Sequence, residues 1–521
     1  MMHGHEKSDP EIAAIRTNAG GIRREKPANN AAPAATELVE RRAGTKENTG
    51  QQSTLRAQDR AGVSQALERI RQAARRNQKE RFTALLHHIT PEVLEKAFRG
   101  ISKEAAPGID GMMRPDYEAD LKFRLADLHA RVHSGAYRAT PSRRVYIPKP
   151  DGGRRPLAVA ALEDKIVQRA TAAVLNAIYE EDFLGFSYGF RPGRGAHDAL
   201  DALSTAIIRT KVNYIVDADI AKFFDTVSQE WLVRFLEHRI GDKRILRLIQ
   251  KWLRAGVLEE GRVEVAEQGT GQGAAISPLL ANIYLHYVLD LWADRWRRRE
   301  ARGNVVIVRY ADDAVFGFEY EDDAHRFLEA MRERLAQFAL TLHPDKTRLI
   351  EFGRHAAVNR ERRGLGKPET FNFLGFTYIA GKSRSGGFLL KRKSRGDRMR
   401  AKLVKLKGQL RRLRHAPLML QGEWLGAVVK GWFNYFAVPT NFPTLAAFHD
   451  HVVELWRRAL NRRSQRGFID KARMAALARE WLPSPKILHP WPERRFAVKH
   501  PRWEPYAGIP HVRFCAGGAQ Q

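Results

Sequence analysis

Two adjacent aspartates between two runs of branched apolar residues constrain this chain more than any other feature. The runs, at 304–309 and 314–318, favour β-strands, and the acidic segment 310–313 (Tyr-Ala-Asp-Asp) joins them. This pattern predicts a β-hairpin with the carboxylates of Asp312 and Asp313 at its tip. Neighbouring carboxylates repel each other unless a cation lies on them, and a divalent metal that also binds triphosphate is the usual reason for such a pair. The alternative is a solvated Asp-Asp turn.

A third carboxylate lies upstream, in a second strand candidate at 213–220. Two-metal phosphoryl transfer needs an acid from another strand, because two cations about 3.5–4 Å apart each need oxygen ligands. Side-chain alternation places Asp217 and Asp219 on the same strand face. Asp219 is nearer the strand's end and is the better metal ligand, whereas Asp217 is interpreted as a structural acid. Neither carboxylate suits so apolar a strand without a partner.

The charge of the chain indicates a polyanionic partner. Its 521 residues include 89 Lys and Arg against 59 Asp and Glu, a formal net charge of +30. An anionic membrane surface is the rival partner, but no apolar run approaches transmembrane length and no signal peptide opens the chain. The single Cys515 excludes a disulfide framework and a cysteine-based zinc site, including that of a His-Asn-His endonuclease. We therefore expect a soluble cytoplasmic protein, associated with the nucleoid when it acts on DNA.

Seven segments, in order, resemble the motifs of the group II intron reverse transcriptase/maturase family, in the bacterial form that lacks the endonuclease domain. The resemblance covers roughly residues 60–521. One departure is Gly271, where the family more often has proline before Gln272. The matching segments are 105–111 (N-terminal extension), 145–157 (fingers hairpin), 189–194, 269–280 (template and nucleotide binding), 342–347 and 373–376 (last palm motifs) and 431–436 (maturase signature).

The resemblance implies an α+β, right-hand polymerase fold, with fingers and palm followed by an α-helical thumb/maturase domain. Composition supports the division, since no Phe, Trp or Tyr precedes Phe82 and the sequence becomes basic after Gly386-Gly387. The expected domains are a disordered segment at 1–60, the N-terminal extension and fingers at 61–210, the palm at 211–385, the thumb/maturase at 386–466, and a tail at 467–521 that could contact DNA.

Periodicity and capping residues predict the helices. Thr90-Pro91 is a typical helix start, and Ser277-Pro278 is a candidate cap followed by a first-turn proline. The expected helices are at 63–89, from 91, 162–179, 228–256, 277–300, 322–339, 391–415, 420–437 and 443–463.

The resemblance also implies roles for single residues. Two Mg²⁺ ions would be held by Asp219, Asp312 and Asp313 with the backbone of Ile220. Lys149 and Arg155, on opposite arms of the fingers hairpin, would reach the incoming triphosphate. The remaining nucleotide-binding candidates are Phe224, which would exclude a ribose 2′-hydroxyl, Gln272, and Lys346, a candidate proton donor to pyrophosphate. Phe224 as a core residue and Lys346 as a plain surface lysine remain open alternatives.

The segment 391–415 carries twelve Lys and Arg residues and one acid, with leucines at helical spacing. We expect it to bind RNA through Arg411, Arg412 and Arg414; the alternative is a merely solvated charged face. Aromatic residues follow at helical spacing, which indicates a hydrophobic core rather than base-stacking residues. These residues are Trp424, Trp432, Phe433, Tyr435 and Phe436.

These features together predict an RNA-directed DNA polymerase, a nucleotidyltransferase of a mobile group II intron. Its expected partners are the intron RNA, an RNA template with a DNA primer, target DNA and deoxynucleotides, with no membrane and an oligomeric state left open. Two alternatives remain: a splicing cofactor that binds RNA with little polymerase use, and a domesticated relative in phage defence or DNA repair.

Overall fold

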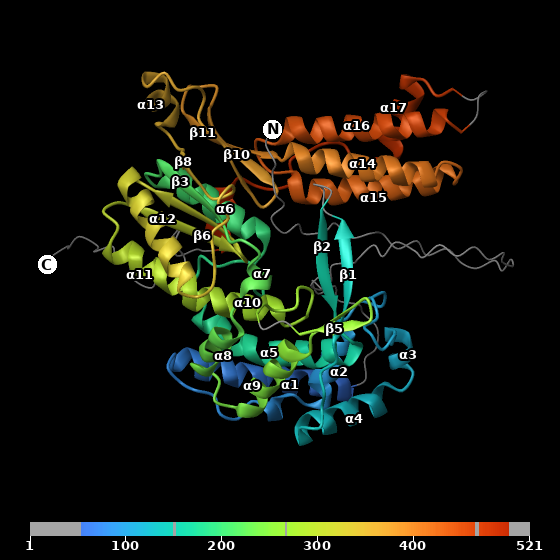
Figure 1. Ribbon diagram of the computed structural model, residues 1–521. Coiled ribbons are helices and arrows are strands. Elements are labelled where there is room, and N and C mark those ends of the chain that lie inside the picture. Colours follow the sequence, from blue (N-terminus) through green and yellow to red (C-terminus); the bar gives the residue numbers. More distant parts are fainter. Residues whose placement is uncertain (1–53, 149–152, 266–267, 464–467, 500–521) are drawn as a thin grey trace. The chain divides into compact units, whose positions relative to one another are not determined.

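The computed structural model describes residues 54–148, 153–265, 268–463 and 468–499 (Figure 1). Lys149 and most of the segment 1–60 therefore lie outside the described residues. The chain divides into two compact units, and the N-terminal unit comprises residues 54–369 together with 492–499. The C-terminal unit comprises residues 370–491.

The N-terminal unit mixes helices and short strands. Its elements are α1 (Thr54–Arg76), η1 (Leu86–His88), α2 (Pro91–Arg99), α3 (Arg114–Glu118), α4 (Leu121–Ser134), β1 (Ser142–Pro148), β2 (Arg154–Val159), α5 (Leu162–Asp182), α6 (Ala196–Arg209), β3 (Tyr214–Asp219), α7 (Phe223–Thr226), α8 (Gln229–Glu237), α9 (Lys243–Arg254), β4 (Val257–Glu259), β5 (Arg262–Glu264), α10 (Ser277–Leu285), the π-helix η2 (His286–Asp290), α11 (Leu291–Arg299), β6 (Val305–Tyr310), β7 (Asp313–Phe318), α12 (Glu321–Ala336), β8 (Arg348–Glu351), α13 (Ala356–Arg362) and α18 (Pro492–Lys499).

An antiparallel sheet in the order β6-β7-β3-β8 forms the centre of this unit. Its strands are apolar because helices cover them: α12 packs against β3 and β7, and α6 lies beside β6. Phe327 of α12 contacts the rings of Phe316 and Phe318 at centroid distances of 4.7 and 5.2 Å. The predicted hairpin is therefore present, with β6 and β7 as its arms.

A second sheet has the order β2-β1-β4-β5. Among the helices of this unit, α5 packs against α1 and α2. The hairpin of β1 and β2 is antiparallel, whereas β1 and β4 are parallel. The start of α2 agrees with the sequence, since the Thr90 side chain accepts a hydrogen bond from the amide of Val93. Helix α1 begins at Thr54, inside the predicted disordered segment, because a helix packed at its C-terminal half propagates towards its N-terminus.

Several predicted helices have different bounds. The helix predicted at 63–89 ends at Arg76, and Phe82 instead bridges Ile240 in parallel. The helix predicted at 228–256 is two helices, because Gly241 and the cap residue Asp242 interrupt it. Ser277 is not a cap: its hydroxyl donates to the carbonyl oxygen of Gly271.

The described part of the C-terminal unit has a sheet in the order β11-β10-β9, formed by β9 (Phe371–Phe373), β10 (Phe376–Lys382) and β11 (Phe388–Ser394). Its helices are α14 (Gly396–Arg412), α15 (Leu418–Phe436), α16 (Phe442–Asn461) and α17 (Lys471–Trp481). The predicted basic helix begins only at Gly396, because residues 391–394 pair with β10. Trp432 stacks on Phe448 with ring centroids 4.4 Å apart, and Phe433 and Phe436 are also buried, as a core assignment requires.

Across the described residues, every helix is too short or too polar to cross a lipid bilayer.

Candidate functional site

The turn between β6 and β7 is short and held in an unusual backbone conformation. Tyr310 pairs with Asp313, which leaves Ala311 and Asp312 as the turn. Ala311 has a φ of 57°, a left-handed conformation that costs a residue with a side chain roughly 1–2 kcal/mol. Asp313 is the first residue of β7 and is buried. The alternative of a solvated turn is therefore wrong for Asp313. Of the two aspartates, only Asp312 lies in the turn itself.

Asp219 lies directly opposite Asp313. The two residues are partners in the antiparallel register of β3 and β7, so their side chains leave the same face of the sheet. Asp217 pairs with Val315 further along the strand and is buried. Ile220 continues the strand through an antiparallel bridge to Leu342. The register therefore brings the carboxylate predicted from a separate strand to the acidic hairpin.

Both β3 acids have a cationic partner, as charges in an apolar strand require. The Nζ of Lys346 lies 3.1 Å from Oδ2 of Asp219, and Nη2 of Arg348 lies 3.9 Å from Oδ2 of Asp217. The backbone amide of His343 donates to the carbonyl oxygen of Asp219 over 2.7 Å, which ties the segment of Lys346 to the strand end. Lys346 is therefore paired with the candidate metal ligand Asp219, and its role as a proton donor stays a prediction.

The donor set at this position suits a hard divalent cation, because carboxylate oxygens are the ligands that Mg²⁺ prefers. Asp219 and Asp313 are opposite each other, and Asp312 precedes Asp313. In the described part of the chain, no three His, Cys, Asp or Glu side chains converge closely enough to hold a metal ion. A cation at Asp219 would compete with the ammonium of Lys346 for that carboxylate.

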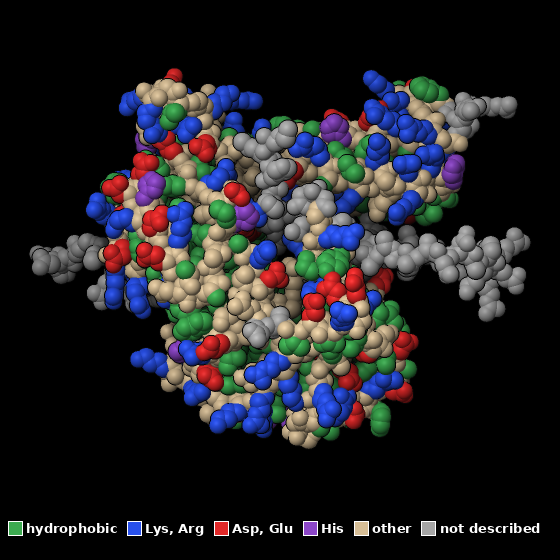
Figure 2. Space-filling model, viewed as in Figure 1, with side chains coloured by type: hydrophobic (Ala, Val, Ile, Leu, Met, Phe, Trp, Pro, Cys, Tyr) green, Lys and Arg blue, Asp and Glu red, His purple; other side chains and the backbone are tan. Residues whose placement is uncertain are grey.

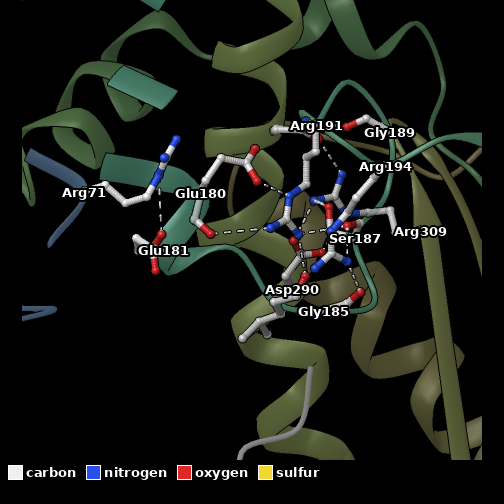
Figure 3. Close-up of polar contacts among 12 residues, drawn as sticks. Arg71, Glu180, Glu181, Gly185, Ser187, Gly189, Arg191, Arg194, Asp290 and Arg309 are labelled. Atoms are coloured by element: carbon white, nitrogen blue, oxygen red, sulfur yellow. Dashed lines mark hydrogen bonds and ion pairs between the residues drawn. The ribbon is translucent and has the colours of Figure 1, made fainter. Parts of the chain in front are cut away.

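A network of buried polar residues around Arg309 bonds to the turn, and Figure 3 shows Arg309 close to Asp290 and Ser187. The guanidinium of Arg309 donates to both carboxylate oxygens of Asp290 over 2.6 Å each and to the carbonyl oxygen of Ala311 over 2.8 Å. It also donates to Oγ of Ser187 over 2.7 Å and to Oδ1 of Asn282 over 3.0 Å. All these side chains are buried.

The segment 184–194 packs on the same turn. The side-chain amide of Asn282 donates to the carbonyl oxygen of Gly189 over 2.7 Å. A Cβ at Gly189 would lie 2.2 Å from the backbone nitrogen of Ala311. Arg191 is buried and bonds to Glu180, and burial lowers the pKa of its guanidinium to about 10. Arg191 and Arg194 both donate to backbone carbonyls of this segment, so their role in this structure is to hold it in place.

A glycine-rich loop (residues 269–273) brings two predicted nucleotide-binding positions together. The backbone amide of Thr270 donates to the carbonyl oxygen of Phe224 over 2.8 Å. The backbone amide of Ala158, in β2, donates to the carbonyl oxygen of Gln272 over 2.7 Å. Gly273 has a φ of 110° and approaches the carbonyl oxygen of Ala158 too closely for a side chain. Gly271 has no such constraint, so its difference from the family's proline leaves the loop intact.

Two neighbouring phenylalanines on α7 have different environments. Phe223 belongs to the core, and Phe224 is half-buried with its ring 5.4 Å from that of Phe223. Arg155 lies in β2, opposite Ile147 in β1, and is half-buried. Its predicted companion Lys149 lies outside the described residues, so their joint approach to a triphosphate stays a prediction.

Exposed Lys and Arg side chains gather over the helices of the C-terminal unit (Figure 2). Arg411 and Arg412 are exposed at the end of α14, and Arg414, just beyond the helix, is half-buried. The predicted segment is not basic on its surface throughout, because three of its arginines are buried. These are Arg392, Arg395 and Arg398.

The sequence reasoning missed the support of the acidic turn. Arg309 is a charged residue within the apolar run of β6. A charge at such a position needs a partner, so it indicates a buried ion pair. Its partners Asp290, Asn282 and Ser187 come from two other segments, which periodicity cannot connect.

Comparisons with known proteins agree with this geometry. Residues 147–378 match the family model described as reverse transcriptase (RNA-dependent DNA polymerase). Protein YkfC of Escherichia coli (strain K12) is 34% identical over 343 residues, which cover 59% of this chain and 85% of YkfC. Group II intron-encoded protein LtrA of Lactococcus lactis subsp. cremoris is 32% identical over 231 residues, 43% of this chain and 38% of LtrA.

An uncharacterized 91 kDa protein in the cob intron of Schizosaccharomyces pombe is 42% identical over 175 residues, 33% of this chain and 21% of that protein. The segment that matches the family model includes the acidic hairpin, the opposing strand β3 and the glycine-rich loop. This chain belongs to the reverse transcriptase family of RNA-dependent DNA polymerases and is related to group II intron-encoded proteins.

Proposed function

We propose that this protein is the reverse transcriptase of a group II intron, which copies the intron RNA into DNA, assists its splicing and supports retrohoming by target-primed reverse transcription. The observation that carries the polymerase part is the register that sets Asp219 opposite Asp313 at the end of the acidic hairpin. Relatedness to LtrA and to the cob-intron protein supports the intron part.

In this proposal the N-terminal unit contains the fingers and the palm as far as residue 369. The C-terminal unit contains the last part of the palm, residues 370–385, and the thumb/maturase domain. Asp219, Asp312 and Asp313, with the backbone of Ile220, would hold two Mg²⁺ ions. Bound Mg²⁺ supplies Lewis-acid stabilisation of the attacking and leaving oxygens in nucleotidyl transfer.

The chain's own residues would bind and orient the deoxynucleotide. Arg155 and Lys149 offer cations for its phosphates. Phe224 lies against the glycine-rich loop that carries Gln272, so its half-buried ring can limit the space beside the nucleotide sugar. Lys346 can hold a proton at Nζ for the leaving pyrophosphate, since it lies beside Asp219.

The test of the polymerase site is Asp312→Asn. Because bound metal supplies several kcal/mol to the transition state, we expect primer extension on an RNA template to fall by about 10³-fold or more. RNA binding, measured by filter retention, should stay near wild type. Asp219→Asn should behave the same way. Robust extension by Asp312→Asn would refute the site, and loss of extension in Asp217→Asn alone would mean that the ligand on β3 is Asp217.

A second candidate function is an RNA-binding splicing cofactor with little polymerase use. The observation in its favour is that the exposed cations of α14 belong to the C-terminal unit, whereas the three carboxylates belong to the N-terminal unit. An Asp312→Asn variant that still accelerates intron splicing at low Mg²⁺ would separate the two functions.

A further inference from the structure

We propose that Arg309 is a positioning residue that fixes the catalytic turn through the carbonyl oxygen of Ala311. This inference rests on the proposed polymerase site. Arg309 itself is only 1% exposed, so it does not touch the substrate. Its effect would pass through the backbone that carries Asp312 and Asp313.

The first argument is the full set of hydrogen bonds that the guanidinium makes. An arginine side chain has five N–H donors in a rigid planar fork. In this structure each of them has an acceptor: two carboxylate oxygens of Asp290, Oγ of Ser187, Oδ1 of Asn282 and the carbonyl oxygen of Ala311. Lysine has three donors and no fork, so it cannot reproduce this set.

The second argument is the conformation that the turn must adopt. Ala311 is left-handed, and such strain persists only where surrounding contacts over-determine it. Two contacts do so here. Arg309 holds the carbonyl oxygen of Ala311, and the backbone of Gly189 lies against its nitrogen. Asn282 joins the two, because its Oδ1 accepts from Arg309 and its amide donates to Gly189.

The third argument is the π-helix η2 between α10 and α11. Residues seven apart share a face of a regular α-helix, because a turn takes 3.6 residues. Asn282 and Asp290 are eight apart, yet both contact Arg309. The segment between them includes the π-helix at His286–Asp290, whose wider turn takes up one extra residue. Such π-turns are rare and recur at functional sites.

An ordinary buried ion pair is the competing explanation, and a double variant separates the two. Removing one partner of a buried pair leaves an uncompensated charge, whereas replacing both by apolar residues is often tolerated. Arg309→Met and Asp290→Leu should each lower the melting temperature strongly. The double variant Arg309→Met/Asp290→Leu should recover most of the lost melting temperature, but it still lacks the hydrogen-bond donor to the carbonyl oxygen of Ala311.

We therefore expect the double variant to fold and to extend primers with a kcat roughly 10- to 100-fold below wild type, the scale of loss from a displaced catalytic group. The KM for deoxynucleotide should be unchanged. Amide hydrogen exchange in peptides covering 305–318 should be faster than in wild type, which a change in activity alone would not report.

The matched control is the ion pair of the buried Arg239 and the mostly buried Asp182, whose Nε and Oδ2 are 2.9 Å apart. It lies in the same unit, and its arginine donates to backbone carbonyls at 77 and 80, away from the turn. Arg239→Met/Asp182→Leu should regain stability and retain wild-type kcat. Wild-type kcat in Arg309→Met/Asp290→Leu would overturn the proposal.

If the double variant does not fold, Arg309→Lys decides, because it keeps the charge opposite Asp290. A lower kcat with unchanged KM then supports the proposal, and wild-type kcat overturns it. Asp312→Asn is measured in parallel. If it remains active, the site assignment has failed; if it is inactive while the Arg309 variants are normal, only the role of Arg309 has failed.

Discussion

At the scale of single residues, Phe223 and Phe224 are neighbours of the same residue type, but their side chains have different surroundings. Phe223 packs edge-on against Tyr284 with ring centroids 6.4 Å apart and is buried. Phe224 is only half-buried, and its carbonyl oxygen accepts the amide of Thr270 in the glycine-rich loop. Phe223 therefore belongs to the core, whereas Phe224 is partly buried against that core, and its role beside the nucleotide sugar stays a prediction.

We expect Phe224→Val to raise incorporation of ribonucleotides relative to deoxynucleotides by roughly 10- to 100-fold, because it opens space beside the sugar. The measurement is competitive primer extension with each nucleotide class. Phe223→Leu is the matched control and should lower stability by about 1 kcal/mol without changing the discrimination. Unchanged discrimination in an active Phe224→Val variant would place the sugar gate elsewhere.

At the scale of elements, Asp242 links a helix start to a segment far away in the sequence. Its carboxylate caps α9 at Arg244 and accepts the backbone amides of Leu85 and Leu86 over 2.8 and 3.0 Å. Burial raises the pKa of this carboxyl, but the hydrogen bonds from Arg244, Leu85 and Leu86 outweigh it and hold the pKa below its ordinary value.

Asp242→Asn should therefore lower the free energy of unfolding by about 1–3 kcal/mol at neutral pH, since buried amides lose an ionised acceptor. A depressed carboxyl pKa contributes stability above the unfolded value near 3.9 and loses it as pH falls through the folded value. The difference between variant and wild type should be constant from pH 7 to 5 and shrink below about pH 4. Urea unfolding at several pH values would measure it, and a difference that grows in acid would contradict this account.

Local sequence patterns predicted which helices and strands form better than they predicted where those elements end or what they contact. Alternation and the short acidic segment were sufficient for the β6–β7 hairpin, and Thr90 was sufficient for the start of α2. The register between Asp219 and Asp313 and the π-turn before Leu291 depend on tertiary packing, which a single sequence does not encode locally. The strand at 388–394 was hidden for a related reason: its basic residues continue the charge pattern of α14.

Helix α14 carries a prediction about RNA. Replacing Arg411, Arg412 and Arg414 together with Gln should weaken intron RNA binding and flatten its salt dependence, by up to ~0.7–0.9 in log–log slope for each phosphate that is no longer neutralised. Splicing at low Mg²⁺ should fall in parallel, while extension on a saturating primer-template should suffer less. The half-buried Arg414 should contribute less to the slope than the exposed pair.

The control for the loss of exposed charge is Lys243→Gln with Arg247→Gln on α9 in the other unit, which removes as many exposed cations as the loss of Arg411 and Arg412. It should leave the salt slope near wild type. Normal splicing without primer extension in the α14 variant would assign that helix to the primer-template duplex instead.

At the scale of the whole molecule, the end of the described chain returns to the N-terminal unit. Helix α18 packs against α6, and the guanidinium of Arg495 bonds to the buried carboxylate of Asp201. Arg209 of α6 also lies 3.7 Å from Glu493. A contact between residues so distant in the sequence stabilises the unit that contains the acidic hairpin.

Arg495→Gln should accordingly lower the free energy of unfolding by about 1–3 kcal/mol, because Asp201 would lose a charged hydrogen-bond partner in a buried position. Thermal unfolding would measure the change. Arg494→Gln removes the same charge from the neighbouring position and should have little effect. Equal melting temperatures for the two variants would mean that the contact of α18 contributes nothing to stability.

Because α18 belongs with residues 54–369, the intervening 370–491 unit is an insertion whose two ends both enter the same folded body. A protease that nicks this insertion once would cut the backbone without freeing either piece. The fragment before the nick and the fragment after it would each retain a part of the N-terminal unit, joined through α6 and α18. The two fragments should elute together from a sizing column and separate only in denaturant. A native gel would therefore show one intact species even though the backbone has been cut.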